Sequence, residues 1–447
     1  MKAMVIGSGG REHAVAWALA KSPGIDEVLC VPGNGGTAAE KKCRNIPVAA
    51  GNLPEIVEAA KREFADGDGS FAVIGPENPL ADGIADLLNA AGIPVVGPMK
   101  AAANLEASKD AAKAFMKKYG VACAASETCT DLETALAAVA KADGAVVVKA
   151  DGLAAGKGVV VAADKATAED AVRRFMQDGE LGDAGKTLVI EEYLAGEEIS
   201  VLAAVSVTPE STADGTACIL PFMPARDHKR LLDGAEGPNT GGMGAISPVP
   251  DLKPEIMQQF QERILEPTLE GLKAEGFDYR GFLFFGLMLT DSGPKLLEYN
   301  VRLGDPETQA VLPLLDSDFA ELCRAITGGT LASFPLKWKS GCVCAPVAVS
   351  AGYPGAYGTG KAIRVDGQKV RSAGGKIFFA GAVQKDGGLY TSGGRVLACA
   401  ASGETPQEAA QHAYAAMDGV HFDGMFFRKD IGAPGAAVSK TMKGGAQ

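Results

Sequence analysis

The chain has 447 residues, of which 47% are hydrophobic and 22% charged, and its formal net charge is −12. This length allows about three domains, and the acidic balance disfavours general nucleic-acid binding, which needs a basic surface. No apolar run approaches the ~18 residues of a membrane span, and no secretory signal precedes the first glycine turn. Nine scattered cysteines without a CxxC pair favour a reducing compartment. We therefore expect a cytoplasmic protein without membrane or nucleic-acid partners.

The first hundred residues alternate short apolar runs with helical patterns. We expect strands at 3–6, 27–31, 71–75 and 93–96, and helices at 11–20, 54–65 and 81–91. This alternation predicts a small parallel α/β domain over residues 1–104. The turns after its strands carry GSGGRE, PGNGG and GPEN, and such turns lie at the carboxyl edge of the sheet, where these folds bind ligands.

The first of these turns, at residues 7–12, resembles a dinucleotide-binding turn. Strand, glycine turn and helix bring backbone N–H groups and the positive helix end to an anion. A dinucleotide fingerprint needs a third glycine where Glu12 stands, and an acidic residue after the second strand, where PGNGG follows. We therefore predict a phosphate or substrate site at Gly9, Gly10 and Arg11, and rank a nicotinamide-dependent oxidoreductase last.

A second candidate site lies at residues 146–161, which read VVVKADGLAAGKGVVV. A P-loop needs four residues between its glycines and Ser or Thr after the lysine. Here three residues separate Gly152 from Gly156, Gly158 follows Lys157, and the chain re-enters a strand. We predict a hairpin whose tip closes over phosphates, with Lys149 on its first strand. A flexible surface hairpin is the alternative.

Two more segments suit a nucleotide and an anionic substrate. In IEEYLAGEE, residues 190–198, a strand ends in a turn that could offer backbone groups from Glu191 to Leu194 to a base, and Glu198 to a ribose hydroxyl. In RDHKR, residues 226–230, a basic cluster precedes the glycine-rich GPNTGGMGA, which suits an anion. The alternatives are a solvated acidic loop and a charged surface loop.

The segment KLLEYNVR, residues 295–302, carries the most specific chemistry. Side chains alternate along a strand, so Glu298, Asn300 and Arg302 share one face. Carboxylate and amide oxygens are ligands that suit Mg²⁺, and an arginine beyond them can hold a transferring phosphoryl group. An internal salt bridge is the alternative. The four histidines are too widely spread to predict a metal site.

The remaining sequence completes the expected domain organisation. We expect a second unit over residues 105–330, with a hairpin-bearing part at about 122–192 and a helix near 254–274. Residues 331–431 are expected to form a β-rich domain that ends in a helix at 406–417. The Ala/Gly/Lys-rich tail, residues 432–447, is expected to be disordered.

These segments together resemble the ATP-grasp superfamily, and within it the glycinamide ribonucleotide synthetase (phosphoribosylamine–glycine ligase) family. The resemblance rests on IGSGGREHA, PGNGGTA, GPENPLADG, VVVKADGLAAGKGV, IEEYLAGEE, RDHKR, GPNTGGMGA and EYNVRLGDPETQ, and continues through SGGRVLA and FRKDIG. It therefore extends over nearly the whole chain. It implies an N-terminal substrate-binding α/β domain, an ATP-grasp domain with a hairpin flap, and a C-terminal β-rich domain.

The resemblance implies ligation of glycine to 5-phosphoribosylamine in purine biosynthesis, with ATP cleaved to ADP and phosphate through a glycyl phosphate. It implies Mg²⁺ or Mn²⁺, small-molecule substrates only, and a monomer. It assigns catalysis to Lys149 and Arg302, and the metal to Glu298 and Asn300. The implied ATP-binding residues are Lys109, Lys149, Gly152, Ala155, Gly156, Lys157, Gly158, Glu191, Leu194 and Glu198. The implied substrate-binding residues are Gly9, Gly10, Arg11, Glu77, Asp227, His228, Lys229, Arg230, Asn239, Thr240, Gly241 and Gly242.

One departure concerns the metal. Many members of the superfamily carry an acidic ligand on the strand before the Glu-x-Asn pair, whereas residues 281–290 hold none. A second metal site is therefore in doubt. Two rival functions stay open: another carboxylate–amine ligase or carboxylase on the same scaffold, and a regulatory protein that binds ATP without turnover.

Overall fold

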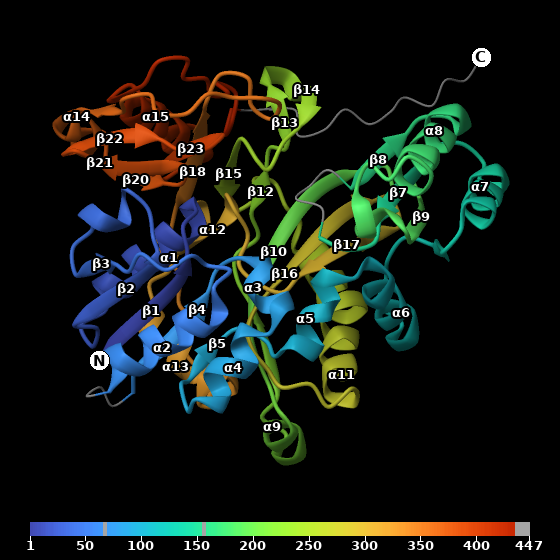
Figure 1. The fold of residues 1–447 in the computed structure, drawn as a ribbon, viewed down its shortest axis with the longest axis horizontal. Helices are drawn as coiled ribbons and strands as arrows, with labels where there is room; N and C mark the ends of the chain where they lie inside the picture. Colours follow the sequence, from blue (N-terminus) through green and yellow to red (C-terminus); the bar gives the residue numbers. More distant parts are fainter. Residues whose placement is uncertain (66–68, 154–157, 434–447) are drawn as a thin grey trace.

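The computed structural model describes residues 1–65, 69–153 and 158–433. In Figure 1 the N-terminal part (blue) lies against the C-terminal part (orange and red), and the middle of the chain forms a sheet beside them. A smaller sheet with its own helices extends from that middle part. The predicted fold class is confirmed: a parallel α/β part is followed by antiparallel sheets. No described helix combines the length and apolar character that crossing a lipid bilayer requires.

The N-terminal sheet has five parallel strands in the order β3-β2-β1-β4-β5. They are β1 (Lys2–Gly7), β2 (Glu27–Pro32), β3 (Cys43–Asn45), β4 (Phe71–Ile74) and β5 (Val95–Val96). The three central strands are apolar and almost wholly buried, as strands of a parallel sheet covered on both faces should be. The edge strand β3 was not predicted, because its three residues are partly or fully exposed and form no apolar run.

Helices α1 (Gly10–Lys21), α2 (Leu53–Phe64) and α5 (Lys100–Ala107) accompany this sheet. The single helix predicted at 81–91 is wrong. The chain instead forms α3 (Glu77–Asp82) and α4 (Ile84–Ala90), separated by Gly83 at φ 94°. Glycine adopts this left-handed conformation at little cost, and it ends one helix before the next begins.

The central antiparallel sheet has the order β11-β10-β16-β17. It contains β10 (Glu197–Val207), β11 (Cys218–Pro221), β16 (Tyr279–Thr290) and β17 (Gly293–Asn300), with α9 (Pro209–Asp214) between the first two. The helix predicted near 254–274 is interrupted. It consists of α10 (Pro254–Phe260), a π turn and α11 (Glu266–Ala274). Pro267 in the first turn of α11 has no N–H for a regular helical ladder.

The smaller sheet, in the order β6-β9-β7-β8, carries the predicted hairpin. Its strands are β6 (Ser126–Cys129), β7 (Val146–Ala150), β8 (Val159–Ala162) and β9 (Leu188–Glu192). Helices α7 (Leu132–Lys141) and α8 (Lys165–Met176) pack on it around a separate hydrophobic core, and α6 (Lys109–Tyr119) precedes it. The antiparallel pairing of β7 and β8 confirms the hairpin rather than a P-loop helix.

The C-terminal sheet has the order β12-β15-β18-β23-β20. Its strands β18 (Cys342–Val349), β20 (Gly375–Phe379) and β23 (Arg395–Gly403) lie beyond residue 330, whereas β12 (Arg226–Asp227) and β15 (Gly244–Ser247) come from the basic and glycine-rich segments. The sheet therefore draws strands from both sides of the predicted boundary at 330. Helix α15 (Pro406–Met417) forms with the predicted bounds, and a short strand at residues 420–421 follows it. The predicted disordered tail falls, from residue 434 on, outside the described residues.

Smaller elements complete the chain. Three two-stranded ribbons pair β13 (Arg230–Leu232) with β14 (Glu236–Asn239), β19 (Arg364–Val365) with β24 (Val420–His421), and β21 (Ala382–Lys385) with β22 (Gly388–Thr391). The short helices are α12 (Glu307–Val311), α13 (Phe319–Thr327) and α14 (Gly367–Ser372). All nine cysteines lie in the described residues and are free thiols.

Candidate active site

The candidate site forms where the carboxyl edge of the N-terminal sheet meets the end of β17. The Arg11 guanidinium donates to the carbonyl oxygen of Leu303 at 3.1 Å. Arg302 Nε lies 3.6 Å from Glu77 Oε2 at the start of α3. The first contact joins residues 292 positions apart in sequence. Together the two contacts place the first and third predicted turns beside the predicted metal-binding face.

The Glu298 face is present, with one difference from the prediction. Asn300 Nδ2 donates to Glu298 Oε1 at 3.3 Å, and Arg302 Nη2 donates to Asn300 Oδ1 at 3.1 Å. Strand β17 ends at Asn300, so Arg302 lies just beyond it, and a bulge interrupts the register between Leu296 and Glu298. Burial acts to raise the pKa of Glu298, but Lys229 and Lys149 outweigh it, and the pKa lies below its usual value.

A buried carboxylate that the sequence reasoning missed holds Arg302 in place. Glu106 Oε1 lies 2.9 Å from Arg302 Nη2, and its other oxygen accepts the backbone N–H of Val301 at 2.7 Å. Burial raises the pKa of Glu106, and Arg302 opposes that effect. Glu106 stands near the end of α5, where a single acidic residue gives no sequence signal of this long-range contact.

Three buried charges lie beneath the hairpin. Lys149 Nζ on β7 lies 2.9 Å from Glu191 Oε1 on β9, and Lys113 Nζ on α6 lies 3.1 Å from Glu191 Oε2. All three side chains are less than a tenth exposed. Lys109, one turn before Lys113, donates to the carbonyl oxygen of Gly152 at 3.0 Å. Burial lowers the pKa of Lys109 and of Lys113, opposed by Glu298 and Glu191 respectively.

The base of the hairpin is tied to the start of α6. Asp151 Oδ1 accepts the backbone N–H groups of Lys109 and Asp110, at 2.6 and 3.2 Å. A carboxylate at a helix N-terminus satisfies donors that the helix itself leaves free. Gly152, at φ 107°, begins the turn that follows. The predicted tip residues Ala155, Gly156 and Lys157 lie outside the described residues, and Gly158 follows them.

On the nucleotide side, Glu191 lies inside β9, in register with Ser126 and Val147. Its predicted backbone contact with a base, and that of Leu194, stay predictions. Glu198 at the start of β10 forms an ion pair with Lys229 from the basic segment. Burial acts to lower the pKa of Lys229, but Glu198 and Glu298 hold it above the usual value. The basic segment and the predicted ribose carboxylate therefore meet.

A second pair of carboxylates lies beyond Lys229. Asp227 is buried, and its Oδ1 has no hydrogen-bond partner among the described residues. Glu307, whose Oε1 accepts from Ser200 Oγ at 2.8 Å, is its electrostatic neighbour. Burial, and then the charge of Glu307, raise the pKa of Asp227 well above its usual value. A Cβ on Gly242, which has φ 115°, would lie 2.8 Å from Asp227 Oδ1, so the loop passes directly over this carboxylate.

The glycine-rich loop is fixed from the C-terminal part. Arg395 donates to the carbonyl oxygens of Gly241 and Asp305, and Thr240 Oγ1 donates to the carbonyl oxygen of Lys229 at 2.8 Å. Arg395 belongs to the SGGRVLA stretch, which carried resemblance but no predicted role. Its guanidinium joins the loop to the segment that follows Arg302.

Three predicted substrate-binding residues are used within the protein. His228 is 1% exposed, with Nδ1 3.1 Å from the carbonyl oxygen of Gly244, and burial lowers its pKa to about 4. Its neutral ring supports the loop and presents no open face. Arg230 and Asn239 lie opposite each other in the β13–β14 ribbon. No hydrogen bond or ion pair between described residues joins these three to the Glu298 face.

The first glycine turn is contacted by an acidic residue of its own chain. The Gly9 N–H donates to Glu12 Oε2 at 2.5 Å, and Arg11 Nε lies 2.6 Å from Glu12 Oε1. The turn therefore binds a carboxylate of its own chain, in the place where an anionic ligand was expected. The phosphate or substrate site at Gly9, Gly10 and Arg11 stays a prediction.

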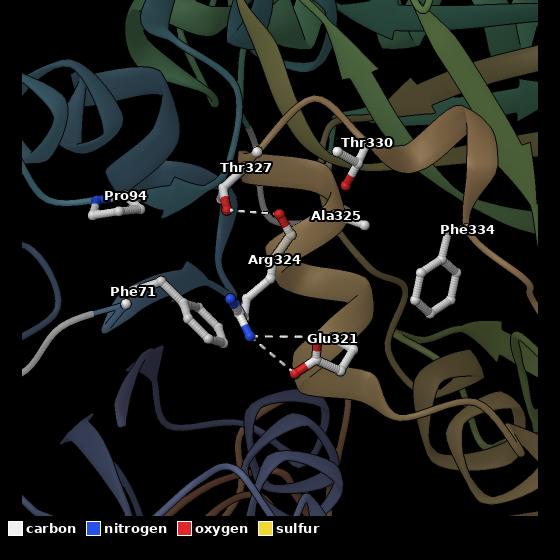
Figure 2. A pocket seen from close by; sticks show the side chains of 10 residues that line it. Phe71, Pro94, Glu321, Arg324, Ala325, Thr327, Thr330 and Phe334 are labelled. Atoms are coloured by element: carbon white, nitrogen blue, oxygen red, sulfur yellow. Dashed lines mark hydrogen bonds and ion pairs between the residues drawn. The ribbon is translucent and has the colours of Figure 1, made fainter.

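A separate pocket of about 440 Å³ lies at the opposite, amino edge of the N-terminal sheet. Figure 2 shows Phe71 and Pro94 facing α13, with Arg324 and Glu321 paired at 3.2 Å on that helix. It lies apart from the charged groups described above and adds nothing to this site.

Models of one protein family match most of the chain. Models of phosphoribosylglycinamide synthetase match the chain as its N domain at residues 1–106, its ATP-grasp (A) domain at 107–308 and its C domain at 343–434. A phosphoribosylamine–glycine ligase of Clostridium acetobutylicum is 46% identical, over 97% of this chain and 99% of that protein.

Two solved structures also resemble this chain, one in sequence and fold and the other in fold only. The crystal structure of phosphoribosylamine–glycine ligase from Thermotoga maritima is 37% identical with a TM-score of 0.82, and covers 96% of this chain and 100% of that one. The biotin carboxylase domain of Hydrogenobacter thermophilus 2-oxoglutarate carboxylase, solved with MgADP and bicarbonate, has a TM-score of 0.69 at 16% identity, covering 95% and 91%. It shares the fold alone. The chain belongs to the phosphoribosylglycinamide synthetase family.

Proposed function

We propose that this chain joins glycine to 5-phosphoribosylamine and cleaves ATP to ADP and phosphate, giving glycinamide ribonucleotide. The observation that carries the proposal is the continuous row from Lys149 through Glu298 and Arg302 to the carboxyl edge of the N-terminal sheet. Cations that suit a nucleotide's phosphates lie at one end of this row, and a separate substrate edge lies at the other. Its family membership supports the same reaction.

The proposed reaction has two steps. A carboxylate oxygen of glycine attacks the γ-phosphorus of ATP, the bond from that phosphorus to the β,γ-bridging oxygen breaks, and glycyl phosphate and ADP result. The amine nitrogen of phosphoribosylamine then attacks the activated carbonyl carbon. The carbon–oxygen bond to phosphate breaks, phosphate leaves, and the amine loses a proton. In both steps negative charge develops, and Arg302 and Lys149 would stabilise it in a site closed to water.

Glu298 and Asn300 fit a divalent cation of the Mg²⁺ type. Both offer oxygen ligands from adjacent positions of one face, and the low pKa of Glu298 keeps it ionised. Such an ion, Mg²⁺ or Mn²⁺, would neutralise charge on the nucleotide's phosphates. No three His, Cys, Asp or Glu side chains gather as a metal site in the described part of the chain. We infer that phosphate oxygens and water would complete the coordination.

The two substrates would occupy the remaining polar groups. The carboxylates of Asp227 and Glu307 suit the ammonium group of glycine, because one of their oxygens is buried without a partner. The edge formed by Arg11 and Glu77 suits the hydroxyl-rich sugar of phosphoribosylamine. Lys109 and Lys149 suit the phosphates of ATP, and Glu198 its ribose. We further propose that the enzyme acts as a monomer in the cytoplasm, which sedimentation and fractionation would test.

The test is ADP release with Mg²⁺ in four reactions: glycine alone, phosphoribosylamine generated in situ alone, both, and neither. ADP in quantity only with both substrates supports the proposal. Release without glycine, or none with both substrates and folded enzyme, would overturn it in favour of another acid or amine. A protein that binds ATP without turnover would show binding in a parallel titration and no ADP in any reaction.

A further inference from the structure

The buried charges of Lys113, Glu191 and Lys149, here called the Lys–Glu–Lys triad, come from three elements of the fold. Lys113 lies on α6, Lys149 on β7 and Glu191 on β9. In the register of the sheet Glu191 lies opposite Val147, two residues before Lys149, so the two side chains are diagonal neighbours on one face. Lys113 reaches the same carboxylate from the helix, at its second oxygen.

The triad carries a net charge of +1 in a position from which water is largely excluded. Lys113, Glu191 and Lys149 are 6%, 3% and 7% exposed. Burying an unbalanced charge is costly unless a partner of opposite charge completes the arrangement. Lys149 alone would form a neutral pair with Glu191, and that pair would add little to the attraction of an anion by Lys109. Lys113 adds a second positive charge, so the three side chains together keep a net charge of +1.

We infer that Lys113 is a positioning residue for nucleotide phosphates, which acts through Glu191 on Lys149. By occupying one carboxylate oxygen, Lys113 neutralises Glu191 and leaves the charge of Lys149 for the phosphates. Lys113 is not proposed to contact the phosphates itself, because its ammonium group faces Glu191 from the helix side. The inference rests on the proposed use of ATP and assigns a role to a lysine that no sequence motif singles out.

A calorimetric titration with ADP and with adenosine separates this electrostatic role from a packing role. Lys113→Met keeps the length of the side chain and leaves Glu191 paired with Lys149, so no buried charge loses its last partner. We expect it to weaken ADP binding about tenfold, the loss that corresponds to removing about 1.4 kcal/mol of electrostatic attraction. Adenosine, which has no phosphate, should bind as it does to the wild type.

Two further variants make the test specific. Lys113→Met combined with Glu191→Gln removes one charge of each sign, restores the net +1 of the triad, and should recover most of the ADP affinity. Lys113→Arg keeps the charge and should bind ADP nearly as well as the wild type. Lys117→Met, on the exposed face of the same helix, is the matched control and should change nothing. Thermal unfolding of each variant checks that the fold is intact.

The inference is overturned if Lys113→Met binds ADP as tightly as the wild type, if it weakens adenosine as much as ADP, or if the double variant is no better than the single one. Failure of the proposed ligase reaction gives a different pattern. ADP release in the four reactions would then be absent while the ADP affinities still followed the charge of the triad. A wild-type protein that binds no ADP would overturn both.

Discussion

Arg302 Nη2 lies 2.9 Å from Glu106 Oε1, and the second oxygen of that carboxylate accepts the Val301 N–H at 2.7 Å. A residue at the end of α5 therefore fixes both the backbone and the guanidinium at the exit of β17. This contact matters because a stabilising group must already be in place when charge develops in the transition state. Arg302 also contacts Glu77 and Asn300. The side chain of Glu106 is more buried than that of Glu77.

We expect Glu106→Gln to lower kcat about 10-fold to 100-fold and to change the KM for ATP little. The amide can still accept the Val301 N–H, but it no longer holds the charge of Arg302, and small displacements of a catalytic group cost rate. Steady-state ADP release measures both constants. Glu270→Gln, which removes an exposed pair with Lys273, should be neutral. A wild-type kcat for Glu106→Gln would contradict the role given to this contact.

Glu298→Ala and Lys149→Ala should each reduce turnover by at least about 100-fold without unfolding the protein. The first removes the ionised oxygen of the metal-binding face, and the second removes the cation between Glu191 and Glu298. ADP release with both substrates and thermal unfolding are the measurements. Lys295→Ala, on the same strand but paired with exposed Glu192, is the control. A folded variant that remained fully active would exclude that residue from the chemistry.

Much of this arrangement could be predicted from local sequence. The apolar runs of β1, β2 and β4, the β7–β8 hairpin and the bounds of α15 follow from patterns within a few residues. Glu298 and Asn300 follow from their spacing on a strand. Each of these depends on neighbours in sequence, where periodicity and turn chemistry are informative.

The rest depends on contacts between distant segments. Glu106 and Lys113 look like ordinary helix residues until β17 and β9 are placed beside them. Glu12 was noticed only because it broke a glycine fingerprint, and nothing local shows that its carboxylate fills the turn. The C-terminal sheet includes β12 and β15, about a hundred residues earlier than β18, and no periodicity in the sequence carries that pairing.

We expect Asp227→Asn to raise the KM for glycine at least about tenfold and to leave the KM for ATP nearly unchanged. A hydrogen bond to a charged group contributes about 1.5–3 kcal/mol, which corresponds to this loss. The same change should raise the melting temperature at pH 7, because it removes a buried charge beside Glu307. Asp291→Asn, in an exposed turn, is the control. An unchanged KM for glycine would remove Asp227 from the glycine site.

A contact that we expect to depend on pH joins helix α1 of the N-terminal part to β20 of the C-terminal sheet. The Phe379 N–H donates to His13 Nδ1 at 2.9 Å, and His13 Nε2 lies 3.3 Å from Glu40 Oε2, which also pairs with Lys376. Since Nδ1 accepts this hydrogen bond, the neutral ring carries its hydrogen on Nε2 and donates to Glu40. Burial acts to raise the pKa of Glu40, but His13 and Lys376 outweigh it and hold the pKa at about 2.

The direction of the pH effect on stability follows from the pKa of Glu40 in the unfolded and in the folded protein. In the unfolded chain this carboxyl takes up a proton near its ordinary pKa of 4.5, whereas in the folded protein it stays ionised until about pH 2. Its contribution to stability is therefore complete above pH 4.5 and is lost as the pH falls toward 2. Melting temperatures of the wild type and of Glu40→Gln should differ most at pH 7, with Glu40→Gln the less stable, and should converge below pH 4.5. Because burial lowers the pKa of His13 and Glu40 acts to raise it, the difference between the two proteins reports the coupled His13–Glu40 pair. A difference independent of pH would mean that Glu40 acts through packing and not through its charge.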